Sequence, residues 1–274
     1  MKVTFCGTGE AFTLGGASSG IIVQHGDTQI MLDCGPGSVQ VAINSGVKLD
    51  EVQAIFITHL HADHVFDIAE LLTSLTFWSD TLPDIYGPSG IVEYMDDTMA
   101  LVRKSVPNLS PFQNSVDRFK VRVTAHEVPI VVGDLTIRSE SVPHTRHVHA
   151  QAYRISTGDS AIVYSGDTQP APDIIVPLAK DADMLIHEAY TAEGLQAQAQ
   201  NVVTIGRKEF ILGAYPASHS LVADVARLAS EAKVGTLVLT HLFQTEKEGA
   251  LITAASEWFD GKVVVARDGL VVLV

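Results

Sequence analysis

Three histidines and one aspartate stand within six residues of one another in the segment Thr58-His59-Leu60-His61-Ala62-Asp63-His64. Imidazole and carboxylate groups are the usual protein ligands of divalent metal ions such as zinc. The segment follows the apolar run 54–58, which has the composition of a β-strand, and leads into a helical pattern. Strand alternation sends His59 and His61 to one side, while the turn redirects Asp63 and His64. The segment can thus serve two neighbouring metal ions, and burying these groups unpaired would be costly.

The elements that must position this segment follow from the spacing of apolar residues. Short β-branched or apolar runs predict strands at residues 1–6, 20–24, 28–33, 53–58, 120–124, 135–142, 151–156, 161–165, 183–187, 236–240, 262–266 and 270–274. Helical spacing predicts helices at residues 38–45, 65–78, 91–103 and 221–232, and residues 105–115 a loop that could act as a flap. We therefore expect one α/β domain over residues 1–274, with two mixed β-sheets packed face to face and helices outside.

Composition limits the partners and the compartment. The formal net charge of −14 opposes a broad contact with long nucleic acid or a membrane surface, which needs clustered Lys and Arg. No apolar run approaches the ~18 residues of a membrane span, and the first residues are too short a run for a secretory signal. Cys6 and Cys34 are expected to be small buried residues and not ligands or a disulfide, so we expect a cytoplasmic protein.

The order His-x-His-x-Asp-His after a strand resembles the metallo-β-lactamase superfamily, whose fold is a four-layer αβ/βα sandwich with a two-metal site. Further matching residues follow later strands in the expected order, namely His144, Asp167 and His241. The resemblance implies that His59, His61 and His144 hold one metal ion and that Asp63, His64 and His241 hold the other. It also implies that Asp167 bridges the two ions.

The identity of the metal is less constrained than its site. All seven implied ligands are nitrogen or oxygen donors, which favours zinc but also suits Mn²⁺ or Fe²⁺. Asp167 stands where class B1 β-lactamases have a cysteine, which argues against the antibiotic-degrading branch.

Other motifs are similar to the ribonuclease Z group and its relatives. They are Phe5-Cys6-Gly7-Thr8-Gly9, Asp33-Cys34-Gly35-Pro36-Gly37, the segment ending His187-Glu188-Ala189, and Ser218-His219-Ser220. In that group the glutamate and the second histidine form a pair that protonates the leaving oxygen, and here they would be Glu188 and His219. An imidazolium held by a carboxylate is a suitable general acid for a phosphoester at neutral pH. Homodimerisation is implied by the same resemblance.

This sequence differs from the ribonuclease Z group in one segment, and the difference bears on the size of the substrate. The tRNA-processing members carry a long arm between the third-motif histidine and the bridging aspartate, whereas His144 and Asp167 are only 23 positions apart. Armless relatives include phosphodiesterases of small or cyclic phosphodiesters and arylsulfatases. We therefore expect a small, anionic, nucleotide-like ester, hydrolysed by a metal-held hydroxide with Asp63 helping to orient the nucleophile and His219 acting as the acid.

Several alternatives remain open at this point. They are tRNA 3′ processing, sulfate ester hydrolysis, lactone opening and, outside the enzymes, a metal-holding scaffold. Arg146, His147 and His149 flank an implied ligand and could line the substrate pocket. Phe77, Trp78 and residues 106–112 could form its apolar walls, although core or surface positions suit these residues equally well.

Overall fold

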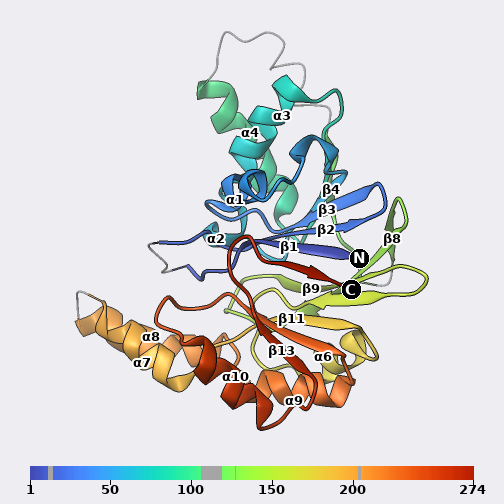
Figure 1. Cartoon of the computed structure of the whole chain (residues 1–274). Coiled ribbons are helices and arrows are strands. Elements are labelled where there is room, and N and C mark those ends of the chain that lie inside the picture. The colour runs from blue at the N-terminus through green and yellow to red at the C-terminus, as the bar shows by residue number, and fades with distance from the viewer. Residues whose placement is uncertain (12–14, 106–118, 127, 203–204) are drawn as a thin grey trace.

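Two β-sheets packed face to face form the centre of the molecule, with helices on both outer faces (Figure 1). The computed structural model describes residues 1–11, 15–105, 119–126, 128–202 and 205–274. The predicted fold class, an α/β sandwich of two mixed sheets, is confirmed within these residues.

Each sheet has seven strands in the described part of the chain. The first has the order β14-β1-β2-β3-β4-β5-β6 and is built from β1 (Lys2–Gly7), β2 (Gly20–His25), β3 (Thr28–Leu32), β4 (Ala54–Phe56), β5 (Asp84–Gly87), β6 (Val121–Val123) and β14 (Val271–Leu273). The second has the order β13-β12-β11-β10-β9-β8-β7 and is built from β7 (Ile130–Val132), β8 (Leu135–Val142), β9 (Ala150–Ser156), β10 (Ala161–Tyr164), β11 (Met184–Glu188), β12 (Thr236–Thr240) and β13 (Lys262–Val265).

Helices cover the outer faces of both sheets (Figure 1). On the first sheet lie α1 (Ser38–Asn44), α2 (Ala62–Val65), α3 (Ile68–Trp78) and α4 (Ile91–Ser105), with the 3₁₀ helix η1 (Leu49–Glu51). On the second lie α6 (Pro172–Ala179), α9 (Val222–Ala232) and α10 (Glu248–Ser256). The pair α7 (Ala192–Gln200) and α8 (Ile205–Ala214) extends to one side and is followed by the 3₁₀ helix η2 (Tyr215–Ala217). None of the helices in the described part combines the length and apolar character that a membrane crossing requires.

Alternation along the strands explains the layered core. One face of each sheet meets the other sheet, where Phe56 stacks on Tyr86 with ring centroids 4.9 Å apart and meets Tyr153 edge-on at 5.6 Å. The other faces pack against helices in two further clusters, and Cys6 and Cys34 are free and buried in one of them.

The structure differs from the predicted elements in a few places. Residues 65–78 are not one helix, because the chain turns between α2 and α3, where the Asp67 amide donates to the Cys34 carbonyl. The last strand, β14, pairs with β1, so the C-terminal half returns to the first sheet. Strands β5 and β7 and helices α6, α7, α8 and α10 were not predicted individually. The predicted loop lies outside the described residues, except for Ser105, which ends α4.

The carboxyl ends of the parallel strands meet at one edge of the sandwich. Strand β4 lies parallel between β3 and β5, and β10, β11 and β12 lie parallel in the second sheet. Because parallel strands present their carboxyl ends at the same edge, the residues that follow these strands come close together.

Gly35 is the point at which the loop after β3 touches the histidine-rich segment. A β-carbon here would collide with the carbonyl oxygen of Asp63. We expect Gly35→Ala to lower the free energy of unfolding by about 1–3 kcal/mol, because backbone must move to relieve the overlap. Denaturant unfolding measures this, and Gly158→Ala is the control, because a β-carbon there meets nothing within 4 Å. Equal stability of the two variants would contradict the packing described here.

Candidate metal centre

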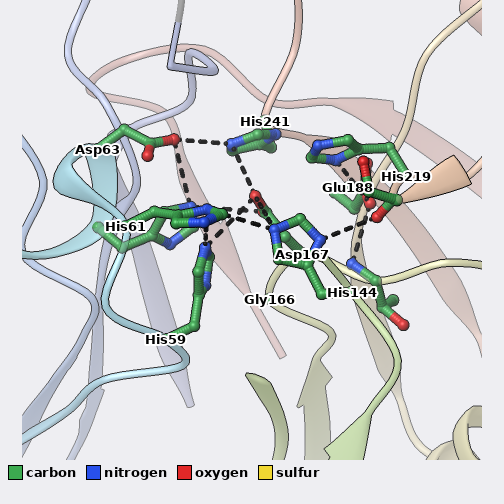
Figure 2. Close-up of polar contacts among 12 residues, drawn as sticks. His59, His61, Asp63, His144, Gly166, Asp167, Glu188, His219 and His241 are labelled. Atoms are coloured by element: carbon green, nitrogen blue, oxygen red, sulfur yellow. Dashed lines mark hydrogen bonds and ion pairs between the residues drawn. The ribbon is translucent and has the colours of Figure 1, made fainter. Parts of the chain in front are cut away.

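The structure brings all seven predicted ligands together at this edge (Figure 2). His59 and His61 follow β4, Asp63 and His64 lie on α2, and the others follow β8, β10 and β12, namely His144, Asp167 and His241. Their donor atoms form two groups within which all atoms lie within 4.8 Å of one another, and Asp167 belongs to both groups. Figure 2 shows Asp167 among the histidines, with Glu188 and His219 to one side.

The first group consists of His59, His61, His144 and Asp167. His61 Nδ1 lies 3.0 Å from His59 Nε2 and 3.3 Å from His144 Nε2. Asp167 Oδ2 lies 3.7 Å and 3.9 Å from the Nε2 atoms of His59 and His144. In a regular tetrahedral zinc site, two nitrogen or oxygen ligand atoms lie about 3.3–3.4 Å from each other. The spacing of these four donors therefore fits one small metal ion.

The second group consists of Asp63, His64, Asp167 and His241. His64 Nε2 lies 3.4 Å from Asp63 Oδ2 and 3.4 Å from Asp167 Oδ1. His241 Nε2 lies 3.1 Å from Asp63 Oδ2 and 3.3 Å from Asp167 Oδ2. These separations fit a second ion. Asp167 Oδ2 lies near nitrogens of both groups and Oδ1 lies near His64, so this carboxylate would be available to both ions.

Two further observations show that this cluster is suited to cations. Apart from their ion-pair contacts at 3.4 Å, His64 Nε2 and Asp167 Oδ1 are buried without a hydrogen-bond partner among the described residues, so both atoms are available to a ligand. Burial alone would lower the pKa of His241, but the charges of Asp167 and Asp63 outweigh it and raise the pKa to about 9. The carboxylates thus draw positive charge into the cluster, and divalent ions would replace these protons. The residues present fit a two-metal site.

Gly166 allows Asp167 to reach this position. Its φ is +56°, in the left-handed region, and a β-carbon would lie 2.8 Å from the Thr58 Cβ. A glycine is therefore needed where the loop after β10 passes Thr58, the residue directly before His59.

Asp33 supports a predicted ligand but was not among the predicted site residues, because its segment was interpreted only as a motif shared with the ribonuclease Z group. It is fully buried, and Oδ2 accepts a hydrogen bond from His64 Nδ1 at 2.8 Å. The carboxylate also accepts bonds from the Thr58 amide and hydroxyl and from the Tyr164 hydroxyl. It thereby directs His64 Nε2 toward the metal cluster. A buried aspartate directly after an apolar strand was the available sequence signal.

The predicted acid pair is also assembled. His219 Nδ1 lies 3.1 Å from Glu188 Oε1, which also accepts the Thr168 amide at 3.0 Å. Burial lowers the pKa of His219 to about 4 and raises the pKa of Glu188 well above its usual range. Burial thus disfavours a separate charge on either side chain, and the 3.1 Å contact keeps the two groups paired. With Nδ1 engaged, Nε2 is the atom of His219 that can meet a substrate.

A cavity of about 700 Å³ opens over the cluster of metal-ligating side chains. This volume is within the usual size range of small-molecule sites. Apart from the cluster and its neighbours, it is lined by Glu10, Ala11, Arg146, Gln169, Phe210, Ile211, Ala214 and Tyr215. Arg146 was predicted to line the substrate pocket, and it does lie in this lining. The apolar wall comes from α8 and η2, which sequence reasoning missed, although the apolar residues of segment 205–215 were visible.

Other predicted wall residues lie elsewhere. His147 and His149 are exposed and are not among the described lining residues. Phe77 and Trp78 are 55% and 81% exposed on α3 and are not in the described lining either, so the pocket role considered for them was wrong. Both residues lie near the end of α3, away from the strand ends that build the cavity. Residues 106–112 lie outside the described residues.

The contact of Asp33 with His64 generates a prediction. We expect Asp33→Asn to weaken metal binding by about 10–100-fold, because the amide lacks the negative charge and one of the two acceptor oxygens that hold His64, Thr58 and Tyr164. Competition with a chelator of known affinity measures the change. Asp50→Asn is the control, because Asp50 lies on η1, outside both donor groups. Unchanged affinity in Asp33→Asn would contradict the role described.

Solved structures with this fold include close matches over the whole chain. The metallo-β-lactamase fold protein YhfI from Bacillus subtilis superposes with a TM-score of 0.76 at 26% identity, covering 99% of this chain and 98% of that one. The short form of human tRNase Z superposes with a TM-score of 0.72 at 23% identity, covering 100% and 99%, and shows the shared fold. The predicted superfamily is thus confirmed.

Sequence relatives agree with these structures. A ribonuclease Z of Mycobacterium bovis is 29% identical over 98% of this chain and 96% of its own length. The probable metallo-hydrolase YhfI of Bacillus subtilis is 28% identical over 99% of both chains. The chain is therefore a metal-dependent hydrolase of the metallo-β-lactamase fold, related to enzymes that cleave phosphodiesters. Residues 1–210 match the family model described as "Anti-Pycsar protein Apyc1", and the chain belongs to that family.

Proposed function

We propose that this chain is a dinuclear, zinc-dependent phosphodiesterase that acts on a small or cyclic nucleotide-like substrate. The observation that supports this most strongly is one cavity that is lined both by members of each donor group and by His219, which Glu188 contacts. A hydrolase that acts on a phosphodiester needs an electrophilic centre to polarise the ester and an acid to protonate the leaving oxygen. Residues suited to each of these two tasks line the same cavity here.

In this proposal the seven donors hold two ions. His59, His61 and His144 hold the first, Asp63, His64 and His241 hold the second, and Asp167 bridges them. When bound, the ions would supply the Lewis acidity that activates a water molecule and polarises the ester. Zinc suits these nitrogen and oxygen donors at the observed separations, and Mn²⁺ and Fe²⁺ are the alternatives.

The remaining steps belong to side chains of this protein. Asp63, whose carboxylate borders the cavity, orients the attacking water. His219, protonated as an imidazolium that Glu188 stabilises through Nδ1, gives its Nε2 proton to the departing oxygen and is left as neutral imidazole. Arg146, exposed at the cavity, meets the anionic group of the substrate.

The size of the substrate is inferred from the segment between His144 and Asp167. It consists of a short loop, β9, the turn 157–160 and β10, so it forms a tight hairpin and leaves no room for a protruding arm. The net charge of −14 also disfavours a long polyanion. The ribonuclease Z relatives keep tRNA 3′ processing as the second candidate, because the same donor set would serve it.

A substrate panel tests this proposal. We expect the zinc- or manganese-loaded protein to hydrolyse bis(p-nitrophenyl) phosphate and a cyclic nucleoside monophosphate. We expect little turnover of p-nitrophenyl sulfate, an acyl-homoserine lactone or a precursor tRNA, because the acid and the cavity suit a small phosphodiester. Release of p-nitrophenolate and chromatography of the products measure the rates. Absence of phosphodiester turnover, or faster turnover of the tRNA, the sulfate or the lactone, would overturn the proposal.

Chelation tests the dependence on metal separately. We expect EDTA to abolish hydrolysis of bis(p-nitrophenyl) phosphate, because the donors alone cannot polarise the ester. Addition of Zn²⁺ after removal of the chelator should restore the rate, whereas Mg²⁺ should restore it poorly because it prefers oxygen ligands. Full activity in EDTA, with metal removal verified, would contradict a metal-dependent mechanism.

The proposal also includes the oligomeric state, the cellular location and the number of domains. We expect a homodimer because of the ribonuclease Z resemblance, and size-exclusion chromatography with light scattering measures the molecular mass. The free thiols of Cys6 and Cys34 share one core cluster, which suits a reducing, cytoplasmic location. We also infer that residues 1–274 form one domain, since both sheets contribute to the inter-sheet core.

A further inference from the structure

One face of the His219 imidazole is covered by an aromatic ring. The ring of Tyr215 stacks on the imidazole with centroids 3.9 Å apart and planes 13° apart. The His241 ring is also nearly parallel to it, at 5.6 Å and 12°, but lies farther away. Tyr215 thus supports one face of the imidazole, while Glu188 holds one edge through Nδ1.

Tyr215 also fixes the backbone that carries His219. Its carbonyl accepts hydrogen bonds from the amides of Ser218 and His219, both at 3.0 Å. The Ser218 carbonyl in turn accepts the Nδ1 proton of His144 at 2.9 Å. The short η2 turn therefore sets the position of the acid relative to one of the proposed metal ligands.

Tyr215 is itself firmly anchored. It is buried in a small cluster with Tyr190, Leu195 and Phe243, and its ring meets Tyr190 edge-on at 5.3 Å and Phe243 at 4.6 Å. It is also part of the cavity lining. A ring held from behind by a packed cluster is a rigid support for the imidazole in front of it.

We propose that Tyr215 is a positioning residue for proton transfer, whose ring holds the His219 imidazole in the orientation that directs Nε2 to the leaving oxygen. This inference rests on the proposed acid role of His219. The hydrogen bond to Glu188 alone would leave the imidazole free to turn about that contact, and the flat support of Tyr215 removes this freedom. Small errors in the placement of a reacting group are costly in rate.

The ring, and not the hydroxyl, has this role. The hydroxyl of Tyr215 is buried and has no hydrogen-bond partner among the described residues. Phenylalanine would keep the stacking surface and remove an unpaired polar atom, so Tyr215→Phe should be fully active and no less stable. Tyr215→Leu removes the flat surface while keeping an apolar side chain in the cluster.

Substrates with different leaving groups separate a positioning role from a purely structural one. p-Nitrophenolate departs readily without a proton, whereas the ribose oxygen of a cyclic nucleoside monophosphate needs one. We expect Tyr215→Leu to lower kcat on the cyclic substrate by roughly tenfold or more, and kcat on bis(p-nitrophenyl) phosphate by less than about threefold. KM should change similarly for both substrates. Leu195→Ala, in the same cluster on α7, is the control for lost packing and should show no such dependence on the leaving group.

His219→Ala is measured beside these variants so that the two proposals can fail separately. If His219→Ala lowers kcat equally on both substrates, the acid role of His219 is wrong, and the inference about Tyr215 is overturned with it. If His219→Ala shows the leaving-group dependence but Tyr215→Leu does not, the acid role stands and the positioning role of Tyr215 is overturned. If Tyr215→Phe loses as much activity as Tyr215→Leu, the hydroxyl is required and the proposal is also overturned.

Discussion

The buried carboxylate of Asp167 is the group on which the rest of the site depends. It is 2% exposed, and its oxygens lie 3.3–3.9 Å from nitrogens of His59, His64, His144 and His241. An isolated charge in this position would be very unfavourable, and the positive charge it attracts must come from protons or from metal ions. The pKa of Asp167 lies well below its usual range, since the neighbouring histidines outweigh the cost of burial. The surrounding fold therefore has to hold these histidines close to the carboxylate of Asp167.

The two sheets meet this requirement by converging at one edge. Four ligands come from the segment that follows β4 and includes the short helix α2, and the other three follow β8, β10 and β12, so no single local segment builds the site. The supporting contacts come from the same places: Asp33 after β3 orients His64, and Ser218 after η2 orients His144. The acid pair also depends on a strand end, because Glu188 is the last residue of β11. The stability of the sandwich and the geometry of the site therefore depend on each other, because each donor group takes residues from both sheets and a shift of either sheet would move its donors apart.

Sequence alone predicted most of this arrangement, and the limits of that prediction have physical causes. The segment from His59 to His64 was informative because its ligand-type residues are adjacent in sequence. Asp33 was missed because its partner His64 is 31 positions away, and its place directly after an apolar strand does not tell which side chain it accepts a hydrogen bond from. The wall formed by Phe210 and Ile211 was missed, and Phe77 and Trp78 were considered instead, because apolar spacing does not tell which helix faces the cavity. The stacking of Tyr215 on His219 depends on the η2 turn, which the pattern of apolar residues does not reveal.

The central claim is that two metal ions are held together around Asp167, and a count of bound metal tests it most directly. The protein is loaded with Zn²⁺, freed of excess by gel filtration and measured by inductively coupled plasma mass spectrometry. The account predicts about two ions per wild-type chain and a large loss from both sites in Asp167→Ala. Asp173→Ala, at an exposed position on α6, should keep both ions. One ion or none in the wild type, or two ions retained in Asp167→Ala, would contradict the account.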